Sequence, residues 1–214
     1  MGRALTTVLA AGLALFGGAT SAVSHPHVFI EGGADLVFDD QGRLSALEIT
    51  WIYDPLASLF IIEEVGLAFN QPLSPPERAE LAAYQTEWAP DFEGDSYVYS
   101  AGAPVKMSGP QNPDADIHHG RLIITFTRTL ETPVSPGEDT VVEIYDPTYY
   151  TAYTITEPPG ITGNGTNCRA RIDPFEPTSD LLALQVSLFD IPADEDPVGN
   201  VGALFADRIR VACD

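Results

Sequence analysis

The stretch that decides the fold is residues 27–53, HVFIEGGADLVFDDQGRLSALEITWIY. Its first part, His27–Phe38, has the composition of a strand, and we expect Gly32-Gly33 to interrupt it as a β-bulge. Asp39–Gly42 has the residues of a tight turn, with a glycine to supply positive φ. Leu44–Tyr53 then alternates apolar and polar residues as a return strand. The sequence therefore predicts that an antiparallel hairpin opens the folded chain.

Two helices are predicted directly after this hairpin. Asp54 ends the return strand and is a good N-cap for a helix over Leu56–Phe69, which carries apolar residues at helical spacing. A second helix is indicated by Ser74 and Glu77, which have the spacing of a capping box around two prolines. We expect this helix to run to about Trp88.

The rest of the chain is typical of short strands separated by Gly, Pro, Asn and Asp turns. These strands are expected at residues 97–101, 105–108, 121–130, 140–145, 150–156, 168–172 and 208–213. Residues 181–189 are compatible with either a strand or a helix. The predicted fold class is α+β, a mainly antiparallel β-sheet with two helices inserted after the first hairpin.

Residues 1–24 have the pattern of a secretory signal peptide. Arg3 gives the positive start, Ala4–Leu15 is an apolar run too short to span a bilayer, and small residues follow it. Cleavage is expected after Ser24, or after Ala22 as an alternative. We therefore expect an exported protein whose residues 25–214 form a single periplasmic domain.

The composition limits the partners. The chain carries 10 Lys and Arg against 31 Asp and Glu, a net charge of −21 at pH 7. Such a surface repels nucleic acid and anionic lipid headgroups. We expect no nucleic-acid partner and at most a peripheral contact with the membrane.

The chain has two cysteines, Cys168 and Cys213. No CxxC spacing or neighbouring histidine points to a metal site at either of them. Because export places the protein in an oxidising compartment, we expect the two to form a disulfide.

The triplet His25-Pro26-His27 is the strongest functional signal. Cleavage after Ser24 makes His25 the first residue, which offers a metal its amine and its imidazole, and His27 adds a further nitrogen; Zn, Cu, Ni and Fe accept such ligands. Cleavage after Ala22 instead leaves Val23-Ser24-His25, whose terminal amine and amides favour square-planar Cu(II) or Ni(II). Pro26 has no N–H and excludes that second geometry from the His25 terminus. The alternative is that both histidines are merely solvated.

Two further segments carry candidate ligands. His118-His119 follows Asp114 and Asp116, a group that either binds metal weakly or forms a polar turn. Asp146 precedes Pro147, which holds it extended, and Tyr149-Tyr150 follow as possible walls of a pocket. We expect Asp146, or one of His118 and His119, to complete a site with His25 and His27. The sequence contains no nucleophile elbow, phosphate loop, HExxH or dinucleotide fingerprint, so we expect no enzyme.

The chain also resembles a known family. The resemblance rests on His25–Ile30, Val37–Leu44, Trp51, Asp54, Tyr145–Tyr150, Cys168 and the closing 206–213 segment. These residues resemble a bacterial family of unknown function (domain of unknown function 1007), described as the periplasmic component of an uncharacterised ABC-type transport system. Its members are often associated with nickel/cobalt transporters. The resemblance implies a metal-handling role at the outer face of the inner membrane, with a metal transporter or permease as partner.

Three hypotheses follow for the function. The first is a non-enzymatic periplasmic accessory protein of a transition-metal transport system, with Ni, Co, Cu or Zn as the bound ion. The second is a β-rich interaction domain that docks on a membrane transporter without metal. The third is a copper enzyme that uses the terminal histidine and His27 as a brace.

Overall fold

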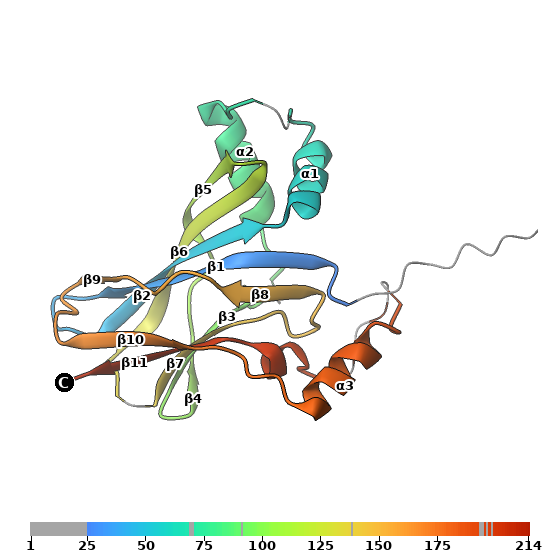
Figure 1. Ribbon diagram of the computed structural model, residues 1–214. Helices are drawn as coiled ribbons and strands as arrows, with labels where there is room; N and C mark the ends of the chain where they lie inside the picture. Colours follow the sequence, from blue (N-terminus) through green and yellow to red (C-terminus); the bar gives the residue numbers. More distant parts are fainter. Residues whose placement is uncertain are drawn as a thin grey trace, which may run out of the picture.

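A computed structural model of the chain (Figure 1) describes residues 25–68, 71–90, 92–137, 139–192, 195, 197 and 199–214. The predicted signal peptide, residues 1–24, lies outside these described residues. Within them, no helix is both long and apolar enough to cross a membrane.

Strands dominate the described chain. The elements are, in order, β1 (Val28–Phe38), β2 (Leu44–Tyr53), α1 (Pro55–Glu64), α2 (Pro75–Thr86), β3 (Ser96–Ser100), β4 (Ala103–Val105), β5 (Gln111–His118), β6 (Arg121–Val134), β7 (Thr140–Ile144), β8 (Thr151–Ile155), β9 (Ile161–Gly163), β10 (Cys168–Asp173), α3 (Ser179–Leu188), the 3₁₀ helix η1 (Gly202–Phe205) and β11 (Arg208–Cys213).

The strands form two sheets that face each other across the core (Figure 1). One sheet has the order β5-β6-β2-β1-β8, with β9 also paired to β1, and the other has the order β10-β11-β7-β3-β4. Every pairing is antiparallel except those of β1 with β8 and β9, which are parallel. The predicted α+β class and mainly antiparallel sheet are confirmed.

The opening hairpin forms as expected, but the predicted bulge at Gly32-Gly33 is wrong. The β1–β2 ladder runs unshifted through both glycines, and its register shifts at Val37/Phe38 instead. Gly32 has a φ of 150°, and a Cβ placed there would lie 2.0 Å from the Thr50 carbonyl oxygen. Glycine is required at this position because the two backbones approach closely.

The predicted cap at the start of α1 is confirmed. The Asp54 carboxylate accepts the backbone N–H of Leu56 at 2.8 Å, within the first turn of the helix. Its other oxygen accepts the Phe29 N–H at 3.0 Å, which ties the helix start to β1. The helix ends at Glu64, earlier than the predicted Phe69.

The second helix, α2, begins with the predicted capping pair, since the Ser74 N–H donates to the Glu77 carboxylate at 2.7 Å. On its exposed side Arg78 pairs with Asp114 and Asp116 of β5. The Asp114–Gly120 segment is predicted as a loop or polar turn. In the structure, most of it belongs to the edge strand β5. Its pairing with β6 is a contact that the local composition did not reveal.

The ambiguous segment near residue 185 is the helix α3. The Thr178 hydroxyl accepts the Leu181 N–H at 3.3 Å as an N-cap. Leu188 of this helix packs with Tyr149 and Phe205 in a small apolar cluster of its own. Figure 1 shows α1 and α3 at the same end of the molecule, where β1 begins.

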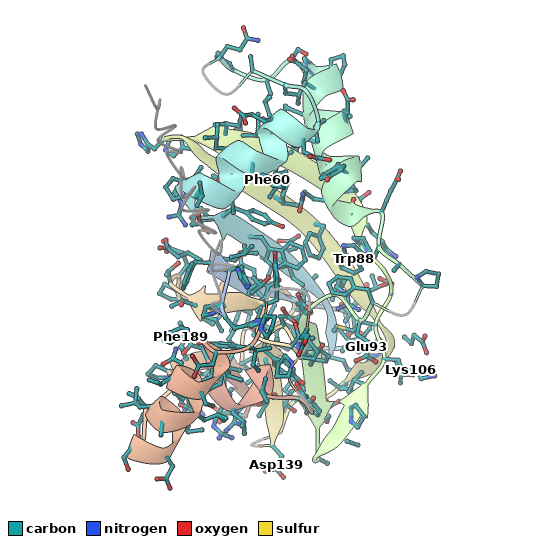
Figure 2. All side chains as sticks on the ribbon, turned by 90° about the vertical axis from the view of Figure 1, so that its right-hand side faces the viewer. Phe60, Trp88, Glu93, Lys106, Asp139 and Phe189 are labelled. Carbon is teal, nitrogen blue, oxygen red and sulfur yellow. A yellow bond between two sulfur atoms is a disulfide. The ribbon has the colours of Figure 1, made fainter. Side chains whose placement is uncertain are left out.

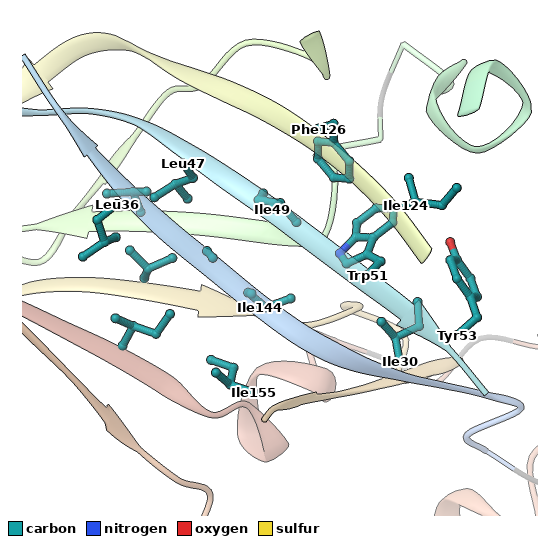
Figure 3. Packing of buried hydrophobic residues seen from close by; sticks show 14 of the residues in the cluster. Ile30, Leu36, Leu47, Ile49, Trp51, Tyr53, Ile124, Phe126, Ile144 and Ile155 are labelled. Atoms are coloured by element: carbon teal, nitrogen blue, oxygen red, sulfur yellow. The ribbon is translucent and has the colours of Figure 1, made fainter. Parts of the chain in front are cut away.

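The main core lies between the two sheets. Figure 3 shows Leu36 of β1, Ile49 of β2 and Phe126 of β6 gathered with Ile144 of β7 and Ile155 of β8. All five are buried. Because the cluster takes residues from both sheets, the sheets share one hydrophobic core.

The predicted disulfide between Cys168 and Cys213 is confirmed. The two residues lie directly opposite each other on β10 and β11, 45 positions apart in the sequence. A cross-link over such a loop lowers the entropy of the unfolded chain, a contribution of about 4 kcal/mol in the chain-entropy model.

Replacing both cysteines by serine is expected to lower the free energy of unfolding by about 4 kcal/mol, because the unfolded chain regains this entropy. Urea unfolding at pH 7 measures the change. A reductant provides the control, because it should destabilise the wild-type protein and leave the stability of the serine variant unchanged. Equal free energies of unfolding for oxidised wild type and variant would refute this contribution.

Candidate metal site

The His25-Pro26-His27 triplet lies at the start of β1, beside the loop that leads into β8. The backbone N–H of His27 donates to the Tyr150 carbonyl oxygen at 2.8 Å. One residue later Val28 pairs with Thr151 in the parallel β1–β8 ladder. The β1–β8 ladder therefore fixes the position of His27 next to Tyr150.

The two imidazole rings are close together and contact the same tyrosine. Their centroids are 5.0 Å apart. His27 stacks on the Tyr150 ring at 4.7 Å, and His25 meets that ring edge-on at 5.9 Å. His25 is fully buried, with 0% of its surface exposed.

Three of the four imidazole nitrogens of this pair are buried without a hydrogen-bond partner. Nδ1 and Nε2 of His25 and Nε2 of His27 are all buried, and none makes a hydrogen bond in the described structure. Nearly all buried polar groups in proteins are paired, so an exception calls for an explanation such as an ion or a water molecule. Neutral imidazole nitrogens are common ligands of transition metals.

The surroundings favour the neutral form of His27. Burial lowers the pKa of its imidazole, and the nearby charge of His25 lowers that pKa further. A neutral ring keeps a lone pair for a metal, whereas a protonated ring has none. The local electrostatics are therefore compatible with a ligand role.

Asp146 stabilises the loop beside the histidines. One carboxylate oxygen accepts the backbone N–H and the hydroxyl of Thr148, each at 2.8 Å, and the other accepts the Thr151 N–H at 2.9 Å. These bonds hold the turn that places Tyr150 against His27. The structure gives the Asp146 side chain a role in the loop and does not group it with the two histidines.

His118 and His119 lie far from the pair, at the turn between β5 and β6. Both are exposed, and their rings are 4.0 Å apart. In the sheet, β6 and β2 separate β5 from β1, so about 14 Å lies between these two strands. Asp114 and Asp116, expected as further oxygen ligands, are paired with Arg78.

Among the described residues, no three His, Cys, Asp or Glu side chains form a group that could hold a metal ion. The structure thus brings together His25 and His27 and adds neither Asp146 nor His118 nor His119. The sequence identified the pair and pointed to Tyr150 as a pocket wall. It missed the parallel β1–β8 pairing that joins them.

Comparison with known proteins places the chain in a family. The family described as protein of unknown function (DUF1007) matches residues 10–213. The chain belongs to this family. It is also 24% identical, over 206 residues, to an uncharacterized protein of Haemophilus influenzae, a match that covers 90% of this chain and 92% of the relative.

In this DUF1007 chain a second polar group is buried between the sheets. Asp95, directly before β3, is 5% exposed and has a φ of 46°. One carboxyl oxygen accepts the Tyr153 hydroxyl at 2.8 Å, and the other is buried without a partner. Burial, and then the charge of Asp146, raise the pKa of Asp95 to about 7, although Tyr153 and Arg128 lower it in part. The sequence gave no signal for this group.

The raised pKa of Asp95 has a consequence for stability. Between about pH 4 and pH 7 the folded protein holds a proton on Asp95 that the unfolded chain releases, so stability falls as the pH rises. The contribution is fully present below the unfolded pKa and is lost as the pH passes about 7. Between pH 5 and pH 8 the loss amounts to about 2 to 3 kcal/mol.

Replacing Asp95 with asparagine is expected to remove this loss, because the amide does not titrate and asparagine tolerates positive φ. Urea unfolding at pH 5 and pH 8, compared between wild type and Asp95→Asn, measures it. Asp40→Asn, a change at an exposed turn residue, is the matched control and should keep the wild-type pH dependence. An Asp95→Asn protein that loses as much stability as wild type between the two pH values would disprove the assignment.

Proposed function

We propose that the protein is a non-enzymatic periplasmic accessory protein of a transition-metal transport system. It binds a divalent ion such as Ni, Co, Cu or Zn through His25 and His27. The single observation that carries the proposal is the set of three buried imidazole nitrogens without hydrogen-bond partners on two adjacent rings. Binding to a metal would satisfy the lone-pair nitrogen of each neutral ring, which is otherwise costly to bury.

The position of signal cleavage decides the remaining ligands. Cleavage after Ser24 would place a free amine on His25 and give the site three nitrogens of its own. Two or three protein ligands leave coordination positions open, which suits a protein that takes up an ion and passes it on. Open positions are also where a transporter would supply ligands of its own.

Titration of the periplasmic protein with Ni(II), Co(II), Cu(II) and Zn(II) tests this function, after intact-mass measurement has located the first residue. The expected result is a His25 terminus and binding of one ion per chain with micromolar or tighter affinity. A His25 terminus without binding of any of the four ions would overturn the metal-binding function.

A second candidate is an interaction domain that docks on a membrane transporter without metal. Large apolar side chains are exposed at the end of the molecule where the histidines lie, with Phe60 of α1 68% exposed and Val186 of α3 62% exposed. Figure 2 shows Phe60 and Phe189 on this side of the molecule. Exposed apolar surface marks contact sites in soluble proteins. Transport that persists in a strain carrying the His25→Ala/His27→Ala protein would favour this second candidate.

A further inference from the structure

A large groove in the described part of the protein is lined by the segment after α2 and by the β3–β4 hairpin. Its volume is about 1360 Å³. Figure 2 shows three of its lining residues, Trp88, Glu93 and Lys106, near one another on one flank of the molecule. Sites for small molecules usually have volumes of about 300 to 1,000 Å³. The size of this groove therefore suits an extended ligand such as a peptide.

Aromatic side chains line the groove, among them the half-buried Trp88 and Tyr97. Tyr97 stacks on Tyr145, with ring centroids 4.3 Å apart and planes at 17°. The Tyr145 hydroxyl lies 3.2 Å from the Tyr99 hydroxyl and accepts a bond of 3.2 Å from the Asn200 amide. These contacts hold the rings in place at the wall of the groove.

A buried arginine makes the groove rigid. Arg128 is 5% exposed and lies 5.4 Å from the centroid of the Trp88 ring. Its guanidinium donates to the carbonyl oxygens of Glu93 at 2.7 Å, Ser96 at 2.9 Å and Ser108 at 2.9 Å. Two segments, one at Glu93–Ser96 and one at Ser108, are thus fixed to Arg128 of β6, so a ligand would meet a preorganised surface.

The rim of the groove is acidic. Glu87, Glu93 and Glu131 are exposed lining residues, and none of them makes an ion pair with another described residue. Lys106 is the one basic side chain exposed at this rim. Together with the net charge of −21, this rim attracts basic ligands and repels acidic ones.

We propose that this groove binds a basic, proline-containing segment of a partner protein. Proline-rich segments are preformed as extended polyproline II helices and dock on aromatic-lined grooves at low entropic cost. The rings of Trp88 and Tyr97 supply such a surface, and the rim glutamates pair with arginine side chains of the segment. This binding function goes beyond the metal site and does not depend on it.

Fluorescence anisotropy with labelled nonapeptides tests the proposal at low salt. The probe is (Arg-Pro-Pro)₃, and the comparison peptides are (Glu-Pro-Pro)₃ and (Arg-Gly-Gly)₃. Saturable binding of the first peptide is expected, with at least fivefold weaker binding of the other two. Absence of binding of (Arg-Pro-Pro)₃, or equal binding of (Arg-Gly-Gly)₃, would overturn the proposal.

A pair of matched variants locates the binding. Glu93→Gln/Glu131→Gln removes two rim charges, and the loss of two exposed ion pairs should weaken binding of (Arg-Pro-Pro)₃ by about three- to tenfold. Glu48→Gln/Glu157→Gln removes two exposed charges elsewhere and should leave binding unchanged. Equal weakening by both variants would mean attraction to the overall charge only, and the groove assignment would then be wrong.

Discussion

Replacing both His25 and His27 by alanine is expected to abolish binding of transition metals by the protein. The two residues supply all of the buried, unpartnered imidazole nitrogens that the structure describes. The alanine variant keeps at most the terminal amine, a single ligand that does not hold a divalent ion tightly. Affinity should fall by at least a hundredfold, equivalent to about 2.7 kcal/mol.

The chain provides a matched control for this experiment. His118 and His119 are the protein's other two histidines, and they are also adjacent to each other, but they are exposed at the β5–β6 turn. The His118→Ala/His119→Ala variant should therefore bind metal with wild-type affinity. Calorimetric titration of both variants with Ni(II) and Zn(II) measures the difference. Loss of binding in the control variant alone would move the metal site to the β5–β6 turn.

Replacing Arg128 with leucine is expected to destabilise the fold more than any substitution of a surface arginine. The change leaves the carbonyl oxygens of Glu93, Ser96 and Ser108 without their guanidinium donor; the bond to Ser96 is buried, and the other two are partly buried. An unsatisfied buried acceptor costs about 1 to 3 kcal/mol, and a hydrogen bond from a charged group contributes about 1.5 to 3 kcal/mol, so a total of about 3 to 5 kcal/mol is expected.

Urea unfolding of Arg128→Leu measures this cost. Arg169→Leu is the control, because Arg169 forms an exposed ion pair with Asp214 in which both side chains are 71% exposed. Such a pair contributes about 0 to 1 kcal/mol. If the two variants unfold at the same urea concentration, Arg128 does not hold the segments around the groove together.

Features that depend on a few neighbouring residues are predictable from the sequence. Asp54 caps α1 and Glu77 bonds to the N–H of Ser74, because a cap and its helix are adjacent in the chain. The turn at Asp39–Gly42 likewise closes the hairpin. The disulfide followed from the expected compartment and from the presence of only two cysteines.

Features that depend on distant residues were not predictable in the same way. His27 meets Tyr150 through a parallel strand pair, and neither the composition nor the periodicity of β1 indicates which strand lies beside it. Gly32-Gly33 indicates a bulge in the sequence but marks a close approach of two backbones in the structure, because both features favour glycine. Arg128 reads in sequence as an ordinary polar residue of a strand, although its side chain is buried.

The most direct test of the metal-binding proposal is the imidazole ¹⁵N NMR spectrum of the protein before and after one equivalent of Zn(II). All four histidines can be followed in one spectrum, and each is assigned from its alanine variant. The expected result is a large shift of the His25 and His27 nitrogens with His118 and His119 unchanged. Unchanged His25 and His27 nitrogens at saturating Zn(II) would contradict the proposal that this pair binds metal.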